Sequence, residues 1–244
     1  LLSGQKELLD RWKRACNTVD QELGEALGQL YVKRYFPPAA KQRIAALVDN
    51  LLASFSDHIR SLDWMTDSTK QKALVKLHAI VKKIGYPDKW KDYSSLSIGR
   101  DDLISNLINC GKFEYQRQVH KLGKPVDRLE WTMTPPTVNA YYSPYTNDVN
   151  FPAGILQPPF FFKDGDDAVN YGAIGMAIGH ELTHGFDDQG RLYDAAGNLN
   201  NWWTREDSTH FVQKANLVVR QYNDYVAVDT FHINGQLTLS LIHI

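Results

Sequence analysis

The sequence predicts an α+β fold that is mainly α-helical, with a small β-sheet at the candidate active site. Apolar residues recur at helical spacing through most of residues 1–125, the composition changes near residue 125, and short strand-like segments bounded by turn residues follow. We therefore expect a helical domain over residues 1–125 and a second domain over residues 126–244.

Two long helices are expected at the start of the chain. The second follows the break at Pro37-Pro38, and its apolar residues recur at helical spacing from Ile44 to Ile59. The first runs from about Leu8 to Tyr35. We expect its buried side to carry Trp12, Val19, Leu23, Leu27, Leu30 and Tyr31.

Two further helices complete the expected first domain. One starts after Thr66 or Asp67, either of which is a good N-cap, and it is expected to end at Gly85. The other is expected from about Asp101 to Leu122. The buried side of the helix that ends at Gly85 is expected to carry Leu74, Leu77, Val81 and Ile84.

The second domain is expected to combine short strands with two helices. Residues 137–142 are typical of a strand, and residues 149–151 are its candidate hairpin partner. The apolar segment 155–162 contains prolines and cannot be a central strand. A helix is expected from Asp166-Asp167 through Gly185, followed by turns and short strands and by a last helix over residues 204–226.

The composition is that of an ordinary globular chain. Of the 244 residues, 43% are hydrophobic and 23% are charged, and the net charge of −1 implies neither a nucleic-acid nor a membrane-surface partner. No run approaches the roughly 18 apolar residues of a membrane helix. Cys16 and Cys110 are too few for a cysteine-based zinc cluster and are expected to be small buried thiols. The start at Leu1, without a leader, is expected of an internal part of a longer protein.

The run His180-Glu181-Leu182-Thr183-His184 carries the most specific chemical signal. The two histidines are four positions apart, so both imidazoles leave one face of a helix and can bind the same zinc ion. Glu181 is expected beside the metal, where it can take a proton from zinc-bound water as a general base. This arrangement predicts attack of hydroxide on a peptide carbonyl. The alternative is a chance motif that contains two satisfied core histidines.

Two features near the motif favour the zinc interpretation. Asp187 follows His184 by three residues and is placed to accept the second N–H of that imidazole, although an ordinary turn aspartate is the alternative. Gly172, Gly175 and Gly179 each cost about 1 kcal/mol relative to alanine in a helix interior. Such a cost suggests close packing of this helix against a neighbour.

Longer runs around the motif carry a family resemblance. They include Phe151-Pro152-Ala153-Gly154-Ile155-Leu156-Gln157-Pro158-Pro159, the stretch from Asn170 to Asp188, and Lys83-Ile84-Gly85-Tyr86-Pro87-Asp88. With these runs the chain resembles the neprilysin family of zinc endopeptidases, in its bacterial branch, over nearly its whole length. The resemblance implies a thermolysin-like zinc-helix region in residues 126–244. It also implies that residues 1–125 are part of a helical domain that roofs a substrate cavity.

The resemblance also implies roles that spacing alone does not. Asn139 and Ala140 would belong to an edge strand that binds the substrate backbone. The family takes oligopeptides rather than folded proteins and cleaves them before bulky hydrophobic residues, with Zn²⁺ as its cofactor. Family analogy favours a periplasmic or extracellular location, although cytoplasmic relatives exist, and it leaves the oligomeric state open.

The sequence departs from the family pattern near its end. The third zinc ligand of the family is a glutamate that should follow Leu237-Thr238-Leu239, where this chain reads Ser240-Leu241-Ile242-His243-Ile244. His243 is not at the position of that ligand. Animal members pair a cysteine at the Cys16 position with one where Leu217 stands here, so Cys16 is expected to be a free thiol. Besides a peptidase truncated before its third ligand, a catalytically silent fragment and a peptide-binding module stay open.

Overall fold

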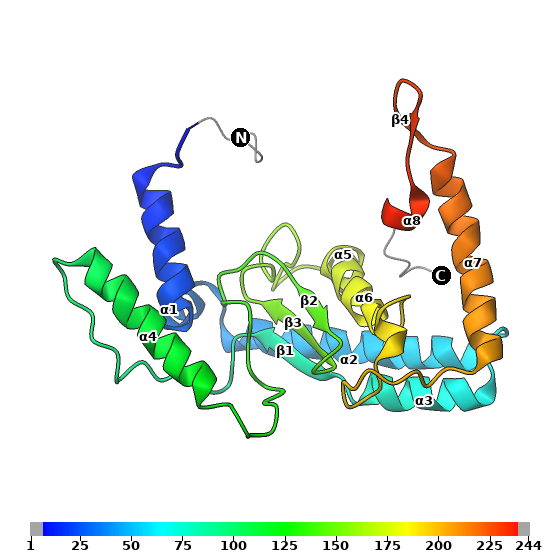
Figure 1. Cartoon of the computed structure of the whole chain (residues 1–244), viewed down its shortest axis with the longest axis horizontal. Helices are drawn as coiled ribbons and strands as arrows, with labels where there is room; N and C mark the ends of the chain where they lie inside the picture. The colour runs from blue at the N-terminus through cyan, green and yellow to red at the C-terminus, as the bar shows by residue number, and fades with distance from the viewer. Residues whose placement is uncertain (1–6, 239–244) are drawn as a thin grey trace.

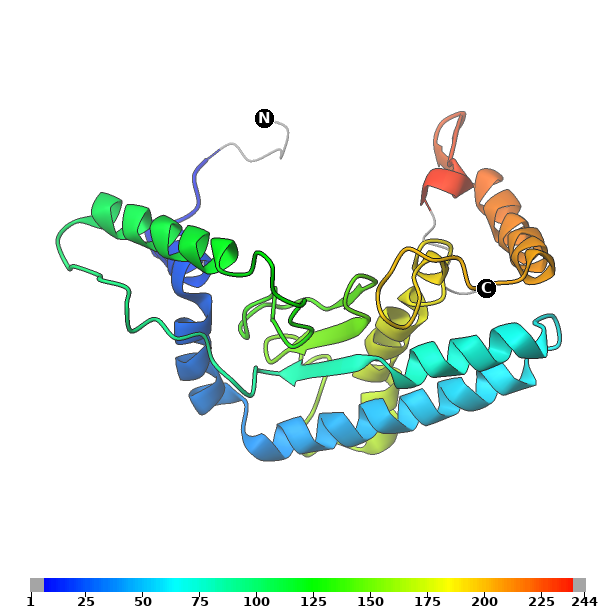
Figure 2. The ribbon, with the colours of Figure 1, turned by 60° about the horizontal axis from the view of Figure 1, so that its bottom comes forward.

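The computed structural model describes residues 7–238 and confirms a mainly helical α+β fold. Its first half is formed by α1 (Arg11–Tyr35), α2 (Pro38–Ser61), α3 (Asp67–His78) and α4 (Leu103–Val119). Figures 1 and 2 show α2 and α3 side by side along the base of the molecule, with α1 and α4 together at one end. The long helix that follows the Pro37-Pro38 break is therefore confirmed.

A three-stranded sheet lies against these helices. It consists of β1 (Val81–Gly85), β2 (Tyr141–Ser143) and β3 (Asp148–Pro152) in the order β1-β3-β2. The central strand β3 is buried along its whole length and pairs parallel with β1 and antiparallel with β2. The hairpin predicted from residues 149–151 is thus confirmed, and β2 is an edge strand.

Strand β1 corrects the prediction for the third helix. Helix α3 ends at His78, and Val81 and Ile84 lie in β1 instead of on a helix face. Two apolar residues three positions apart fit a helix, but the partner strand β3 lies far along the chain, and its Phe151 pairs with Ile84. Long-range pairing of this kind overrides a local periodicity. Gly85 ends the strand with a φ of 75°, a conformation that also suits the helix end assigned to it from sequence.

Helix α1 is present, and its predicted buried side is only partly right. Leu23, Leu27 and Tyr31 are half-buried. Trp12, Val19 and Leu30 are exposed, and the fully buried residues of the helix are Gly24 and Gly28. A side chain at either glycine would collide with Thr134 or Pro135, so the helix approaches the 134–135 segment through its two smallest residues. Apolar spacing could not reveal a contact that is made by glycines.

The second half contains α5 (Asp167–Gly172), α6 (Ile174–His184), η1 (Gly190–Leu192) and α7 (Arg205–Asn223), followed by β4 (Val226–Val228), β5 (Phe231–His232) and α8 (Gly235–Thr238). Helix α7 begins after its N-cap Thr204, as predicted. The predicted strand over residues 137–142 begins only at Tyr141. Before Tyr141 the chain packs against Gly154, whose N–H donates to the oxygen of Pro135 and where a side chain would meet the backbone oxygens of Pro136 and Thr137.

The predicted helix from Asp166-Asp167 to Gly185 is two helices. Ala173 has φ −97° and ψ −88°, which breaks the helix between α5 and α6. Glycine at positions 172 and 175 weakens both sides of that point. The expected close packing at the glycines is not found within residues 7–238, because a Cβ at Gly172 or Gly179 would meet nothing within 4 Å.

The core joins the two halves of the described chain. Ile44 and Val48 from α2, Leu77 from α3, Val149 and Phe151 from β3, and Ile174, Ile178 and Leu182 from α6 all belong to one cluster of buried residues. Helix α6 is therefore held between α2 and the sheet, with contacts to α2, β2 and β3. Burying each such side chain contributes about 1.5–3 kcal/mol, so the orientation of α6 is strongly fixed.

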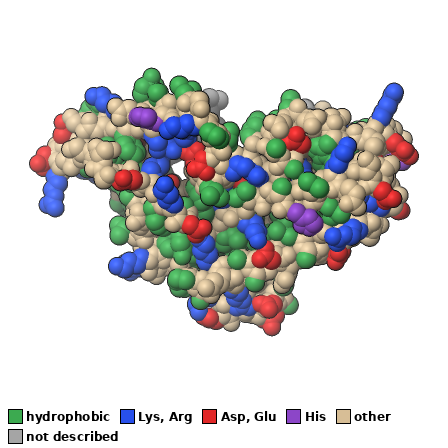
Figure 3. All heavy atoms as spheres, turned by 90° about the horizontal axis from the view of Figure 1, so that it is seen from below, with side chains coloured by type: hydrophobic (Ala, Val, Ile, Leu, Met, Phe, Trp, Pro, Cys, Tyr) green, Lys and Arg blue, Asp and Glu red, His purple; other side chains and the backbone are tan. Residues whose placement is uncertain are grey.

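The surface is mixed in charge. Figure 3 shows blue and red side chains interspersed with hydrophobic ones over one face, without a large area of a single sign. In the part of the chain that is described, no helix is long and apolar enough to cross a bilayer. Both cysteines are free thiols; Cys110 is buried as predicted, but Cys16 is exposed.

Candidate metal centre

The last two turns of α6 bring the two predicted histidine ligands together. Nε2 of His180 and Nε2 of His184 are 3.1 Å apart, and the two rings are nearly perpendicular, at 86°. Both residues lie on an unbroken helix, because the break at Ala173 comes before its first residue. The opposite side of α6 carries Ile174, Ile178 and Leu182, which are buried in the core. The amphipathic pattern of α6 therefore turns the imidazoles away from the core.

The spacing of these nitrogens suits one zinc ion. Zinc binds histidine nitrogen at about 2.0–2.1 Å, so two such ligands of one tetrahedral ion lie about 3.3 Å apart. The observed 3.1 Å between His180 and His184 is close to that separation. Neutral imidazole is also a donor that zinc prefers. The two residues therefore fit part of a zinc site.

Asp187 holds the second imidazole in place. Its Oδ2 atom lies 2.7 Å from Nδ1 of His184, and its Oδ1 atom accepts hydrogen bonds from the backbone N–H groups of Gln189 and Gly190. An ionised carboxylate can only accept, so Nδ1 of His184 carries the proton and Nε2 presents its lone pair. Asp187 lies where the sequence predicted it, in reach of the second nitrogen.

These contacts shift the pKa values of both groups. The hydrogen bond to Asp187 raises the pKa of His184, although burial acts in the opposite direction. Burial by itself would raise the pKa of Asp187, but the hydrogen bonds from His184, Gly190 and Gln189 outweigh it and lower that pKa. Asp187 therefore stays ionised to a lower pH than an ordinary aspartate, and the ring of His184 keeps its second proton to a higher pH than an ordinary histidine.

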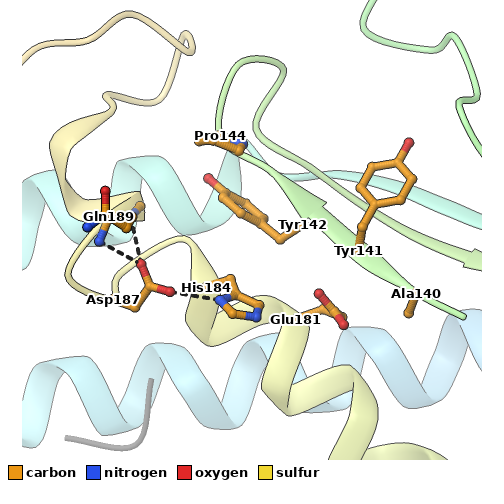
Figure 4. A pocket seen from close by; sticks show the side chains of 9 residues that line it. Ala140, Tyr141, Tyr142, Pro144, Glu181, His184, Asp187 and Gln189 are labelled. Atoms are coloured by element: carbon orange, nitrogen blue, oxygen red, sulfur yellow. Dashed lines mark hydrogen bonds and ion pairs between the residues drawn. The ribbon is translucent and has the colours of Figure 1, made fainter. Parts of the chain in front are cut away.

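Glu181 faces the same pocket as His184, as Figure 4 shows. Burial raises the pKa of Glu181, and the neighbouring His184 and the backbone of Tyr142 only partly offset that effect. A carboxylate with a raised pKa is a stronger base than an exposed one. Glu181 thus has the position and the electrostatic setting that proton transfer at the metal would require.

The pocket is an open cavity of about 310 Å³ between α6 and the edge strand β2. Its lining includes Ala140, Tyr141, Tyr142 and Pro144 on the strand side, and Glu181, His184, Asp187, Gln189 and Gly190 on the helix side. Of the two predicted substrate-binding residues, Ala140 therefore lines the pocket. Asn139 is exposed, and its Oδ1 atom accepts a hydrogen bond from the N–H of Ala140.

Within residues 7–238, no third histidine, cysteine, aspartate or glutamate joins the pair to complete a metal-binding group. The sequence prediction about the third ligand concerns residues after Thr238, and His243 with them, and these lie outside the described residues. His232, on β5, is exposed and bonded to the backbone oxygen of Asn223. The described part of the chain thus offers two candidate ligands, whereas a catalytic zinc site normally has three protein ligands.

Two residues near the site were missed by sequence reasoning. Tyr142 lies over the C-terminal end of α6 with its ring against Gly185, and burial raises the pKa of its phenol. Lys76, from α3, is buried, and its ammonium donates to backbone oxygens that follow α6. A lysine on a polar helix face is usually exposed, so the sequence carried no signal for Lys76.

Two comparisons of the sequence with known proteins indicate the same family. Two models described as "Peptidase family M13" match residues 1–87 and residues 139–242. Neprilysin-11 of Caenorhabditis elegans is 41% identical over 247 residues, which cover 98% of this chain and 29% of that protein. Endothelin-converting enzyme 1 of Rattus norvegicus is 39% identical over 245 residues, covering 96% of this chain and 32% of that protein.

Solved structures agree with this family. The zinc metalloprotease Zmp1 of Mycobacterium tuberculosis matches with a TM-score of 0.87 and 48% identity over 98% of this chain and 37% of that one. PepO from Lactobacillus rhamnosis matches with a TM-score of 0.88 and 38% identity over 99% of this chain and 38% of that one. The chain thus spans about a third of the length of its relatives. Since the two family models together match well over half of its residues, the chain belongs to peptidase family M13.

Proposed function

We propose that this chain carries the zinc-binding helix of a zinc-dependent endopeptidase that hydrolyses oligopeptides before bulky hydrophobic residues. The observation that carries the proposal is the 3.1 Å separation of the two Nε2 atoms of His180 and His184, with Glu181 in the same pocket. The names of the relatives, among them a zinc metalloprotease and an endothelin-converting enzyme, support it.

In this proposal each residue of the chain has a separate task. When bound, zinc would acidify a water molecule and polarise the peptide carbonyl. Glu181 takes the proton of that water as the new C–O bond forms, and then delivers it to the amide nitrogen as the C–N bond breaks. His180 and His184 would hold the metal through Nε2, and Asp187 keeps the proton of His184 on Nδ1.

The edge strand supplies a place for the substrate backbone. Among residues 7–238, strand β2 pairs with β3 alone, and it faces α6 across the pocket, so an extended peptide can add along its other edge. Ala140 lies directly before β2 and lines the pocket. We assign Asn139 to the same backbone contact, which requires its amide to leave the N–H of Ala140 when a peptide binds.

We also propose that the two parts expected from sequence, residues 1–125 and 126–244, belong to a roof of the substrate cavity and to the catalytic domain. Residues 122–127 are all exposed, as expected of a connection between such parts. Limited proteolysis should then cut first in this segment, and a first cut elsewhere would move the boundary.

The test separates general base from metal ligand. In the chain extended to the length of its M13 relatives, Glu181→Gln should leave zinc bound and lower turnover by about 10²–10⁴-fold. His184→Ala should lose the metal. Equal loss of zinc in both variants would refute the division of tasks. Peptide binding without chelator-sensitive cleavage would favour the alternative of a peptide-binding module, which the incomplete ligand set within residues 7–238 keeps open.

A further inference from the structure

A buried lysine connects α3 to the segment that follows the zinc-binding helix. Lys76 is 1% exposed, and its Nζ atom donates to the backbone oxygens of Gly185 at 2.7 Å, Gly190 at 2.6 Å and Tyr193 at 2.7 Å. An ammonium group has three N–H donors, so all three are used. The three acceptors come from one segment, residues 185–193, which Figure 4 shows folding back beside His184.

The buried charge of Lys76 must be offset by favourable interactions with its surroundings. Burying an ammonium group is costly unless it is paired and fully hydrogen-bonded. Burial lowers the pKa of Lys76 to about 8, against the opposing attraction of Asp187 and Asp194, so the group is still mostly charged at neutral pH. It sits at the C-terminal end of α6, where the helix dipole favours a positive charge. The rings of Tyr142, Phe186 and Trp202 surround it, each centroid between 5.6 and 5.9 Å away.

The same segment carries the group that orients the metal ligand. Gly190 accepts from Lys76 through its oxygen and donates through its N–H to Asp187 Oδ1 at 2.7 Å. The other carboxylate oxygen of Asp187 bonds to His184 Nδ1. Gly190 also packs so closely that an added Cβ would lie 1.8 Å from the oxygen of His184. A continuous set of contacts therefore runs from Lys76 through Gly190 and Asp187 to His184.

We propose that Lys76 is a positioning residue of the metal centre: its ammonium group fixes residues 185–193 so that Asp187 holds His184 in the Nδ1–H tautomer. The inference rests on the proposed function only in taking His184 as a zinc ligand. The tautomer itself can be measured on this chain without any metal.

The experiment compares two buried lysines. Lys76→Met removes the three donors and keeps most of the side-chain volume. Lys83→Met is the matched control, because Lys83 is also buried, at 4% exposed, but bonds to the backbone of Glu130 and pairs with Asp148 instead of contacting residues 185–193. In both variants, ¹⁵N NMR of the histidine rings reports the tautomer of His184, and amide hydrogen exchange reports the N–H of Gly190.

Lys76→Met should lose the single Nδ1–H tautomer of His184 and the protection of the Gly190 amide from hydrogen exchange. Lys83→Met should keep both, even where the two variants have the same free energy of unfolding. Zinc affinity should fall by about 10–100-fold in Lys76→Met alone, as is usual when a group behind a ligand is removed. A folded Lys76→Met protein with an unchanged tautomer and unchanged Gly190 exchange would overturn the proposal.

Two further measurements complete the test. If Lys76→Met does not fold, Lys76→Gln must show the same losses. On the unchanged protein, added zinc must shift the Lys76 ammonium resonance and leave that of Lys83 in place, and an indifferent Lys76 signal alongside zinc-responsive histidines would reject the proposal. If zinc moves neither His180 nor His184 in the chain extended to the length of its M13 relatives, the proposed function itself fails, so the two failures are distinguishable.

Discussion

His180, Glu181 and His184 were predictable from sequence because a helix is a local structure. Once α6 is helical, residues four apart must share a face, and the 3.1 Å between the Nε2 atoms follows with little help from the rest of the fold. Asp187 was predictable for the same reason, since it follows the helix by a short turn. Lys76 and Tyr142 were not, because their approach to α6 depends on packing between elements far apart in sequence.

The first residue-scale prediction concerns pH and metal binding. The hydrogen bond to Asp187 raises the pKa of His184 above its ordinary value of 6.5 in the metal-free protein. Metal binding needs the neutral ring, so zinc competes with this proton. Apparent zinc affinity should fall as pH falls, with a midpoint above 6.5. Competition titrations between about pH 5.5 and 8.5 measure it.

The raised pKa of His184 weakens zinc binding at low pH, but it stabilises the metal-free fold at low pH. A raised folded-state pKa contributes stability that is fully present below the unfolded value and is lost as pH rises through the folded value. Asp187→Asn should remove both effects and move the zinc midpoint down toward 6.5. A midpoint at or below 6.5 in the unchanged protein would contradict the assignment.

At the scale of elements, the hairpin of β2 with β3, and helices α2, α4 and α7, followed from sequence, because local spacing and capping residues define them. Strand β1 and the break at Ala173 did not. Val81 and Ile84 are in a strand because β3 is available to pair, and no local pattern contains that information. The buried side of α1 was predicted only in part, because Gly24 and Gly28 make its contact and glycines are not part of a hydrophobic pattern.

One element-scale prediction concerns the joint between α3 and α7. Asp207 is fully buried and accepts hydrogen bonds from the backbone and hydroxyl of Thr66 and from the hydroxyls of Thr69 and Thr204. Asp207→Asn replaces one acceptor by an amino group that faces these donors, so unfolding free energy should fall by about 2–3 kcal/mol. Asp102→Asn is the control, because Asp102 is an exposed N-cap and asparagine caps equally well. Urea denaturation compares them, and equal midpoints would disprove the role of Asp207.

A second element-scale prediction uses two helix glycines with opposite surroundings. At Gly28 in α1, an added Cβ would lie 2.6 Å from Pro135, so Gly28→Ala should destabilise the protein by about 1–3 kcal/mol. At Gly111 in α4, nothing described lies within 4 Å, so Gly111→Ala should stabilise it by about 0.5–1 kcal/mol. Thermal unfolding measures the direction of both changes in stability. A stabilising Gly28→Ala would mean that α1 does not dock on the 134–135 segment.

At the scale of the whole molecule, α6 is the element that the rest of the fold supports. It packs against α2 and the sheet, and Lys76 of α3 and Tyr142 contact the residues at its C-terminal end. Family resemblance predicted this region from sequence, because long exact runs are specific. How α2 and α3 together support the helix was not predictable, since that arrangement arises from long-range packing around Ile174, Ile178 and Leu182.

The last prediction concerns the 244-residue chain by itself. Its described residues bring together two imidazoles, whereas a catalytic zinc normally has three protein ligands and a water. A missing anionic ligand removes a bond and the charge that offsets Zn²⁺.

We therefore expect the chain alone to bind zinc orders of magnitude more weakly than its extended form and to show no chelator-sensitive cleavage of a peptide with an internal Phe or Leu. Calorimetry with stoichiometric zinc and a peptide assay, with Glu181→Gln as the matched blank, measure both. Cleavage that chelator abolishes and Glu181→Gln lacks would mean that another residue completes the site. His232 could do so through Nε2, because its Nδ1 atom lies 3.1 Å from the backbone oxygen of Asn223 and leaves Nε2 as the ligand nitrogen. His232→Ala would then abolish the cleavage if His232 is that ligand, whereas cleavage that survives this change would direct attention to residues after Thr238.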